Sequence, residues 1–182
     1  GPDRIILLPL YPQFSTTTTE SFTQAWYPAA AAVGISAPTA EICCWPEADG
    51  FIDAVARGTD AAIAKLPADI PYRVLFSAHG LPKKIVESGD PYESHVERTS
   101  AAALARLAKP GADHAVCYQS RVGPMEWLQP YTEDEINKAG ADGIALVVVP
   151  VAFVSEHSET LVELDIEYAE LAQEAGVPHY VR

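Results

Sequence analysis

The stretch Ile-Ala-Leu-Val-Val-Val-Pro at residues 144–150 decides the fold class. It is a short, unbroken apolar run that proline ends, which is typical of a strand buried on both faces of a parallel sheet. Segments of helical period separate it from similar runs elsewhere in the chain. These runs lie at residues 5–10, 41–45, 72–77, 114–118 and 177–181. The alternation predicts a doubly wound, Rossmann-like α/β fold, with a parallel sheet and helices on both of its faces.

Composition limits the classes of function. The chain has 182 residues, with 12 Lys and Arg against 25 Asp and Glu, a formal charge of -13. A nucleic-acid binder that works through bulk positive charge is therefore excluded, and we expect no nucleic-acid partner. Because 48% of the residues are hydrophobic, the chain can bury a sizeable core. We expect residues 1–182 to form a single α/β domain.

The sequence also bears on location. The richest apolar run, Ile144–Val154, has eleven residues, fewer than the roughly 18 that a membrane span needs. Ile5–Leu10 lacks the cleavage site of a signal peptide. These features predict a cytoplasmic protein with at most peripheral contact with the inner membrane. Cys43, Cys44 and Cys117 match neither a disulfide framework nor zinc-ligand spacing, and we interpret them as reduced core thiols.

Several familiar catalytic motifs are missing from the sequence. Neither the G-x-G-x-x-G fingerprint nor the G-x-x-x-x-G-K-[ST] loop occurs, so nucleotide chemistry lacks its usual supports. Ser77 stands two residues before His79, but the G-x-S-x-G elbow of serine hydrolases is absent. Hydrolase chemistry therefore has little support.

Titratable side chains gather after two predicted strands. His79 ends one strand, and Glu156, His157, Glu159 and Glu163 follow another with helical spacing. Imidazole and carboxylate ligands suit hard to borderline divalent metals, so the pattern indicates a metal-handling site with a base beside it. A loop histidine held by backbone hydrogen bonds is the alternative for His79. A solvated acidic helix face is the alternative for the glutamates, and we favour it for residues 167–174.

Five segments resemble the ferrochelatase family of haem biosynthesis, in the same order along the chain. They are LYPQFS at 10–15, LFSAHGLP at 75–82, GDPY at 89–92, QSRVGPMEWL at 119–128 and PVAFVSEHSETLVELD at 150–165. The resemblance implies a chelatase-type α/β fold and a lyase that inserts Fe²⁺ into protoporphyrin IX to form protohaem.

The resemblance also implies roles for individual residues. His79 and Glu159 match the family's histidine and catalytic glutamate, and the histidine acts there either as the acceptor of pyrrole protons or as a metal ligand. Glu156, His157 and Glu163 resemble a path for metal entry or proton exit. The positions expected to contact porphyrin are Tyr11, Pro12, Gln13, Ser77, Trp127 and Phe153.

The chain departs from the family in extent and in cysteines. Family members contain two similar domains, and the sequence resembles mostly the second, so an N-terminal domain and a C-terminal extension are expected to be absent. Thr16 stands where one iron–sulfur ligand of animal members falls, and Cys43, Cys44 and Cys117 do not reproduce the set. We therefore expect no iron–sulfur cluster. Three alternatives stay open: a small dimeric tetrapyrrole chelatase for another metal, a non-enzymatic metal- or haem-binding module, and a catalytic half that is inactive without its missing domain.

Overall fold

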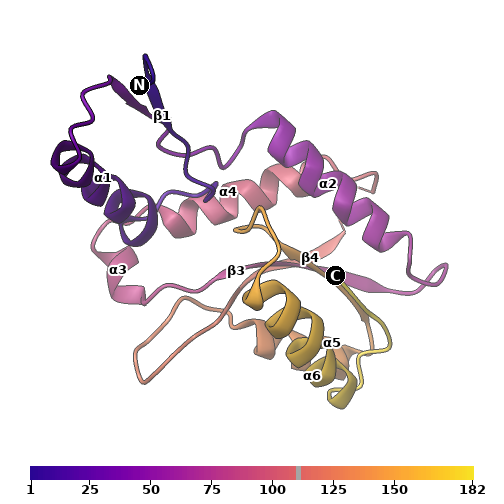
Figure 1. Ribbon diagram of the computed structural model, residues 1–182. Helices are drawn as coiled ribbons and strands as arrows, with labels where there is room; N and C mark the ends of the chain where they lie inside the picture. The colour runs from indigo at the N-terminus through magenta and orange to yellow at the C-terminus, as the bar shows by residue number, and fades with distance from the viewer. Residues whose placement is uncertain (110–111) are drawn as a thin grey trace.

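The computed structural model describes residues 1–109 and 112–182, and the strands in those ranges form two parallel sheets (Figure 1). The smaller sheet pairs β1 (Ile5–Leu7) with β2 (Thr39–Glu41). In the larger sheet the strand order is β4-β3-β5-β6. Its strands are β3 (Tyr72–His79), β4 (Asp113–Gln119), β5 (Ala145–Pro150) and β6 (Tyr180–Val181). The predicted parallel α/β fold is confirmed, with β1 and β2 paired to each other rather than added to the main sheet.

Helices cover both faces of the main sheet (Figure 1). On one face lie α2 (Asp49–Ile63) and α4 (Tyr92–Ala105), and on the other lie α5 (Thr132–Asp142) and α6 (Tyr168–Glu174). A short helix, α3 (Lys83–Glu87), precedes α4, and α1 (Ser21–Ala32) belongs with β1 and β2. Two π-helical segments, η1 (Thr16–Glu20) and η2 (Glu159–Glu167), lead directly into α1 and α6. No helix in the described ranges is long and apolar enough to cross a bilayer.

The core of this larger body follows the two-residue period of its strands. Val74 and Phe76 of β3 pack with Ile52 of α2. The intervening Leu75 packs with Ile136 of α5 on the opposite face. All five side chains are inaccessible to solvent. Because β3 is buried on both faces, its sequence is continuously apolar rather than alternating.

The strand order creates a switch point between β3 and β5. The chain leaves β3 toward β4 on one side and leaves β5 toward β6 on the other. The connections therefore diverge beyond the carboxyl ends of these neighbouring strands, where open α/β sheets place their ligands. His79 is the last residue of β3, and Ser77 is in register with Pro150 at the end of β5.

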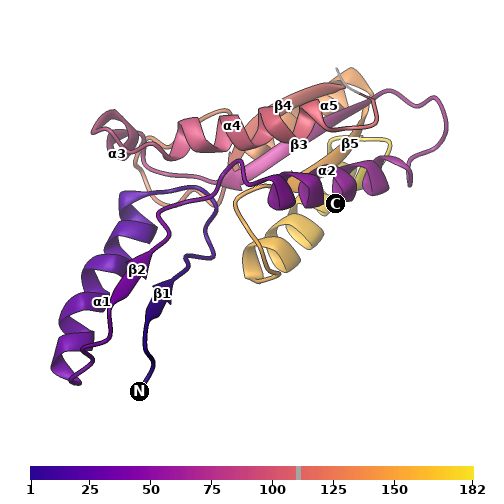
Figure 2. The ribbon, with the colours of Figure 1, turned by 90° about the horizontal axis from the view of Figure 1, so that it is seen from above.

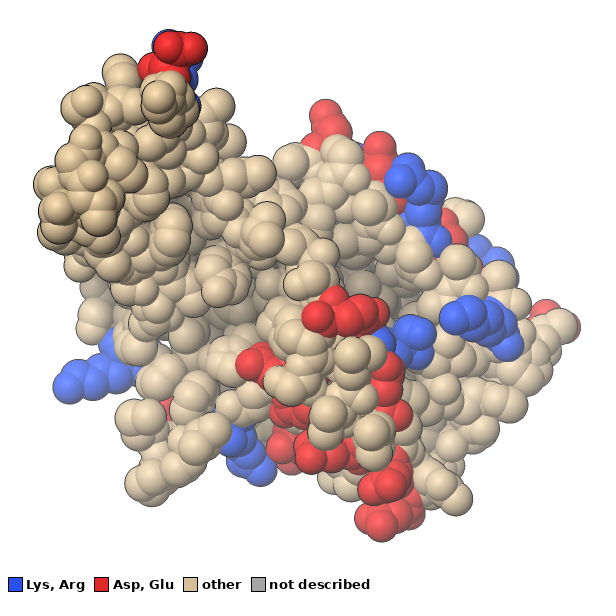
Figure 3. Space-filling model, viewed as in Figure 1, with Lys and Arg blue, Asp and Glu red and all other residues tan. Residues whose placement is uncertain are grey.

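Residues 5–41 form a unit that projects from the body, and we call it the N-terminal unit (Figure 2). Many of its large apolar side chains are exposed: Ile6, Leu8, Leu10, Tyr11, Phe22, Tyr27, Val33 and Ile35. Within the face shown in Figure 3, this part of the surface carries few charges.

The predicted strand at residues 41–45 lies too late in the chain, because β2 ends at Glu41 and beyond Ile42 the pairing with β1 gives way to a bond to a loop. Ile42 N donates to Leu7 O at 2.9 Å, and Trp45 N donates to Pro12 O at 2.9 Å. The interpretation of the cysteines as core thiols holds for Cys117, which is buried, and is wrong for Cys43, which is exposed in this segment.

The predicted helix at residues 156–175 begins later, at Glu159, and its first half is π-helical. A π-helix bonds residues five apart instead of four, so its turns are wider than those of an α-helix. In such a helix side chains three apart no longer share a face, whereas those four apart, such as Glu159 and Glu163, still do. Glu156 and His157 lie before the first residue of η2, so their expected helical spacing with Glu159 and Glu163 does not hold.

Candidate functional site

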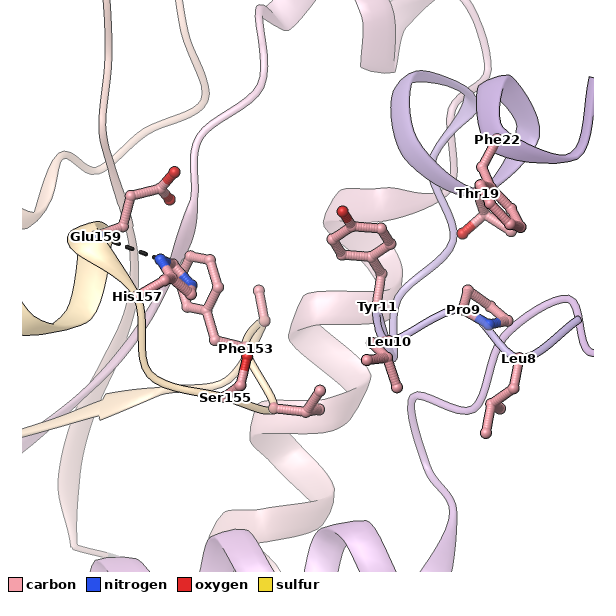
Figure 4. Close-up of a pocket in the computed structure, with 12 residues that line it drawn as sticks. Leu8, Pro9, Leu10, Tyr11, Thr19, Phe22, Phe153, Ser155, His157 and Glu159 are labelled. Carbon is pink, nitrogen blue, oxygen red and sulfur yellow. Dashed lines mark hydrogen bonds between the residues drawn. The ribbon is translucent and has the colours of Figure 1, made fainter. Parts of the chain in front are cut away.

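A cavity of about 570 Å³ lies between the N-terminal unit and the body (Figure 4). Figure 4 shows Tyr11 on one side of the opening and Phe153, His157 and Glu159 on the other. Apolar side chains of Leu8, Leu10 and Phe22 extend the wall on the side of the N-terminal unit. A smaller cavity of about 230 Å³ shares Tyr11, Phe153 and Glu159 and adds His79. The site is thus built jointly by the two parts of the molecule.

His79 and Glu159 form a direct pair at this switch point. His79 Nδ1 lies 2.7 Å from Glu159 Oε2. The two side chains are 38% and 35% exposed, so a substrate in the cavity can reach them. One comes from the end of β3 and the other from the start of η2, 80 residues later in the chain. The structure therefore brings together the two residues predicted to be catalytic.

The backbone around His79 is fixed on both sides. Tyr92 OH donates to His79 O at 2.9 Å, and burial raises the pKa of this phenol, which keeps it a donor. A Cβ at Gly80 would come within 3.0 Å of Gln119 O and 3.3 Å of the Trp127 ring. Glycine is needed for this close approach. Trp127 accordingly packs against Gly80, and its indole Nε1 donates to Val122 O at 3.1 Å.

Gln119, at the end of β4, holds the start of η2 in place. Its Nε2 donates to Glu159 O at 3.0 Å and to Glu163 Oε2 at 2.9 Å. Ser77 Oγ donates to Gln119 Oε1 at 2.8 Å, and both side chains are buried. Ser77, predicted to contact porphyrin, therefore lies beneath the site and supports Gln119.

Glu163 is occupied by donors from the protein. Ser120 N donates to Oε1 at 2.8 Å, and Ser120 Oγ and Tyr168 OH also donate to this carboxylate. Together with Gln119, these bonds use the acceptor positions of both oxygens. Glu163 is absent from the linings of both site cavities. Its position favours a role in anchoring η2 over a role in binding metal.

Glu156 and His157 also have protein partners. Arg182 approaches Glu156 at 3.3 Å, and hydrogen bonds from Thr160 and Arg182 lower the pKa of this carboxyl. His157 Nδ1 accepts from Glu159 N at 3.2 Å, and its ring lies 4.4 Å from that of Phe153. The structure therefore does not bring the five predicted metal ligands into one group. Among residues 1–109 and 112–182, no three such side chains meet in metal-binding geometry.

The remaining residues predicted to contact porphyrin differ in whether they line both cavities, the smaller one only, or neither. Tyr11 and Phe153 line both cavities. Gln13 lines the smaller one, while its buried amide donates to Thr99 Oγ1 and Val151 O, each at 3.0 Å. Pro12 is buried, and neither it nor Trp127 belongs to either lining.

Sequence reasoning missed Asp90, which links the N-terminal unit to the body. This buried carboxylate accepts from Ser15 Oγ at 2.9 Å, Thr16 N at 2.7 Å and Tyr92 N at 2.9 Å. Burial opposes ionisation of Asp90, but the bonds from Thr16, Tyr92 and Ser15 prevail and lower its pKa. The unusually long connection at residues 78–92, with its GDPY stretch, was the available signal.

The fold and site first define a class: a parallel α/β protein with an imidazole–carboxylate pair at the edge of a cavity at the switch point. Comparison with known families is more specific, because the family model described as ferrochelatase matches residues 1–182. The chain belongs to the ferrochelatase family.

Curated relatives named ferrochelatase agree with this assignment. The chain is 55% identical to one from Phenylobacterium zucineum over 184 residues, covering 100% of the chain and 52% of the relative. It is 50% identical to one from Caulobacter vibrioides, covering 100% of the chain and 51% of the relative. A Rickettsia bellii relative is also 50% identical, over 98% of the chain and 49% of its own length. The chain spans about half the length of the curated relatives it matches.

Proposed function

We propose that this chain carries the metal-insertion site of a ferrochelatase, which inserts Fe²⁺ into protoporphyrin IX and releases two protons to form protohaem. The observation that supports this most directly is the His79–Glu159 pair, 2.7 Å apart at the rim of the cavity. Family membership and the names of the relatives point to the same reaction. Fe²⁺ and protoporphyrin IX are then the substrates.

In this proposal His79 is the base that accepts the pyrrole protons. If Nδ1 carries its proton toward Glu159, the other ring nitrogen is free to accept one. The imidazolium formed is stabilised by the adjacent carboxylate, and a base in such a position accelerates proton transfer by about 10²–10⁴-fold. The porphyrin loses two protons as it gains a dication, so the pair acts once for each proton.

Glu159 has a second part in the proposal, as an oxygen donor to the arriving Fe²⁺. Carboxylate and imidazole are suitable ligands for a borderline divalent ion. His157 and Glu163 are proposed to position this glutamate, because they bond to its backbone amide or hold its helical segment through Gln119. Glu156, bound to Arg182, is proposed to lie on the outer part of the metal or proton path.

The cavity supplies the walls that a planar macrocycle requires. Its volume of about 570 Å³ falls within the usual range for ligand sites, about 300–1,000 Å³. Phe153 and Tyr11 face each other across it, and Leu8 and Phe22 add apolar surface. Apolar contacts remote from the reacting nitrogens provide binding energy that can distort the ring toward metalation.

The proposal extends to partners and location. Since the chain spans half of its relatives, we propose that the remaining half, or a second copy of this chain, completes the pocket and covers the apolar surface of the N-terminal unit. We also propose a cytoplasmic location with at most peripheral membrane contact, because a net charge of -13 disfavours binding to anionic lipid. The absence of an iron–sulfur cluster stays a prediction.

Anaerobic metalation tests the proposed reaction. Protoporphyrin IX is mixed with Fe²⁺, or with Zn²⁺ as a surrogate, and insertion is followed by absorbance. The chain is assayed alone and with the remaining half of the protein added; we expect metal insertion where the pocket is complete, and His79→Ala and Glu159→Gln to lose at least about 100-fold in rate. Glu170→Gln, an exposed glutamate of α6, is the matched control and should keep the parent rate.

Two results would contradict the proposal. Undiminished insertion by His79→Ala would remove the base from the mechanism. Binding of metal and porphyrin without insertion, unchanged in His79→Ala, would instead favour the non-enzymatic binding module.

A further inference from the structure

A pair of adjacent thiols lies outside the proposed catalytic site. Cys43 Sγ and Cys44 Sγ are 3.0 Å apart, in direct contact. Cys43 is exposed and Cys44 is partly buried, whereas Cys117, on β4, is buried in the core beneath α5 and α6. The first two sulfurs are thus both close enough to react with each other and accessible to a small oxidant.

We propose that Cys43 and Cys44 form a reversible disulfide on exposure to a peroxide, and that this bond changes the wall of the substrate cavity. The second part of this inference rests on the proposed function. Hydrogen peroxide oxidises the exposed Cys43 thiol to a sulfenic acid and is reduced to water. Cys44 sulfur then attacks Cys43 sulfur, the S–S bond forms, and the sulfenic oxygen leaves as a second water.

The chemistry of the two thiols differs in a way that suits this order. Cys43 is the exposed thiol, and burial and the hydrogen bond with Cys43 raise the pKa of the Cys44 thiol to about 11, which disfavours direct oxidation of Cys44 by peroxide. A disulfide between sequence neighbours closes a small, strained ring, because the two Cα atoms are only about 3.8 Å apart. Strain makes such a bond easy to reduce, as a reversible switch requires.

The segment that carries the thiols is bonded to the cavity wall on both sides. Before them, Ile42 N donates to Leu7 O at 2.9 Å. After them, Trp45 N donates to Pro12 O at 2.9 Å, and the Trp45 indole Nε1 donates to Pro9 O at 3.0 Å. The loop between these acceptors contains Leu8 and Tyr11, which line the cavity. We expect ring closure to turn the peptide between the cysteines and so to weaken the bonds on either side.

Mass spectrometry tests the disulfide itself. The reduced chain is treated with hydrogen peroxide, and its mass should fall by about 2 Da, the two hydrogens lost, with the change located at Cys43 and Cys44 and reversed by dithiothreitol. Cys117→Ser should behave like the parent, because burial raises the pKa of that thiol to about 12. Cys43→Ser and Cys44→Ser should not lose this mass. An unchanged mass, a stable gain of oxygen or a disulfide between two chains would overturn the proposal.

Hydrogen exchange of backbone amides tests whether the disulfide changes the cavity wall, and it does not require porphyrin. Oxidation should speed hydrogen exchange at Ile42 and Trp45 by at least about tenfold and leave the amides of β3 unchanged. Protoporphyrin affinity should fall by about three- to tenfold in the parent and not in Cys43→Ser. Unchanged exchange would overturn the link to the cavity. Failure of the reduced chain to bind porphyrin would count against the proposed function, while mass and exchange would still decide the thiol proposal.

Discussion

The body and the N-terminal unit bury their large apolar side chains to very different extents. The main sheet has helices on both faces, and β3 and β5 carry side chains that are almost fully enclosed. The N-terminal unit, by contrast, is one two-stranded sheet with α1, and its large apolar side chains are mostly exposed. A two-stranded sheet is marginal on its own. The body therefore supplies most of the stability, and the N-terminal unit depends on bonds to it.

Those bonds are polar and come from a few residues. Asp90 accepts hydrogen bonds from Ser15 and Thr16. Thr99 Oγ1 accepts one from the Gln13 amide, and His95 Nδ1 accepts one from Phe14 N at 3.2 Å. The His79–Glu159 pair lies on the body, whereas Tyr11 lies on the N-terminal unit. The site thus lies at the seam, by which we mean the contact between the stable body and the dependent N-terminal unit. A modest change in the stability of that contact can alter the pocket.

We expect the largest difference between the two regions in the free energy of unfolding when one phenylalanine in each is replaced by alanine. Phe76→Ala opens a cavity beside a fully buried strand and should lower the free energy of unfolding by about 3–5 kcal/mol. Phe22→Ala removes a ring that is 49% exposed and should cost less than about 1 kcal/mol. Urea unfolding measures both. Equal costs would show that the N-terminal unit is packed as firmly as the body.

A smaller effect is expected from removing the charge that joins the regions. Asp90→Asn leaves the donors of Ser15 and Thr16 poorly matched and should cost about 1–3 kcal/mol. Limited proteolysis should then cut residues 14–20 faster, with cutting of the body unchanged. Thr59→Ser, in which α2 keeps its buried hydroxyl, serves as the control.

The pH dependence of Asp90 gives this prediction a second readout. Its pKa in the folded chain lies below the usual 3.8, so its contribution is complete above about pH 4 and is lost as the pH falls through the lowered pKa. The difference between the parent and Asp90→Asn should therefore shrink toward pH 3. A difference that stays constant would mean that the ionised carboxylate does not hold the seam.

The smallest effect is expected at His95. Burial, followed by the charge of Arg98, lowers the pKa of His95 from 6.5, while Glu47 and Asp90 oppose the shift. Neutral Nδ1 accepts from Phe14 N, so this bond is complete above pH 6.5 and is lost as the pH falls through the lowered pKa. His95→Ala should cost about 1 kcal/mol at pH 7.5 and less at pH 5, by urea unfolding. A cost that does not change with pH would refute this role.

Much of the body was predictable from sequence, because burial on both faces leaves continuous apolar runs at residues 72–77 and 144–149. The positions of His79 and Glu159 followed from the ends of these strands. Pairing of β1 with β2 was not predictable, since an apolar run indicates burial but not which strand it joins. The role of Asp90 was hidden because its Ser15 and Thr16 partners are 75 and 74 residues away. The expected grouping of Glu156 with Glu163 was wrong because Glu156 precedes η2 and pairs with Arg182, while Glu163 is bonded to Gln119 and Ser120.

Porphyrin binding tests most directly the claim that the site is shared across the seam. The dissociation constant of protoporphyrin IX is measured by absorbance titration for the parent, Tyr11→Ala and Phe153→Ala. Tyr11 and Phe153 lie on opposite sides of the cavity, so each variant is expected to bind protoporphyrin IX at least about tenfold more weakly, as loss of a large apolar contact implies. Weakening by Phe153→Ala with undiminished binding by Tyr11→Ala would contradict that claim, because the site would then belong to the body alone.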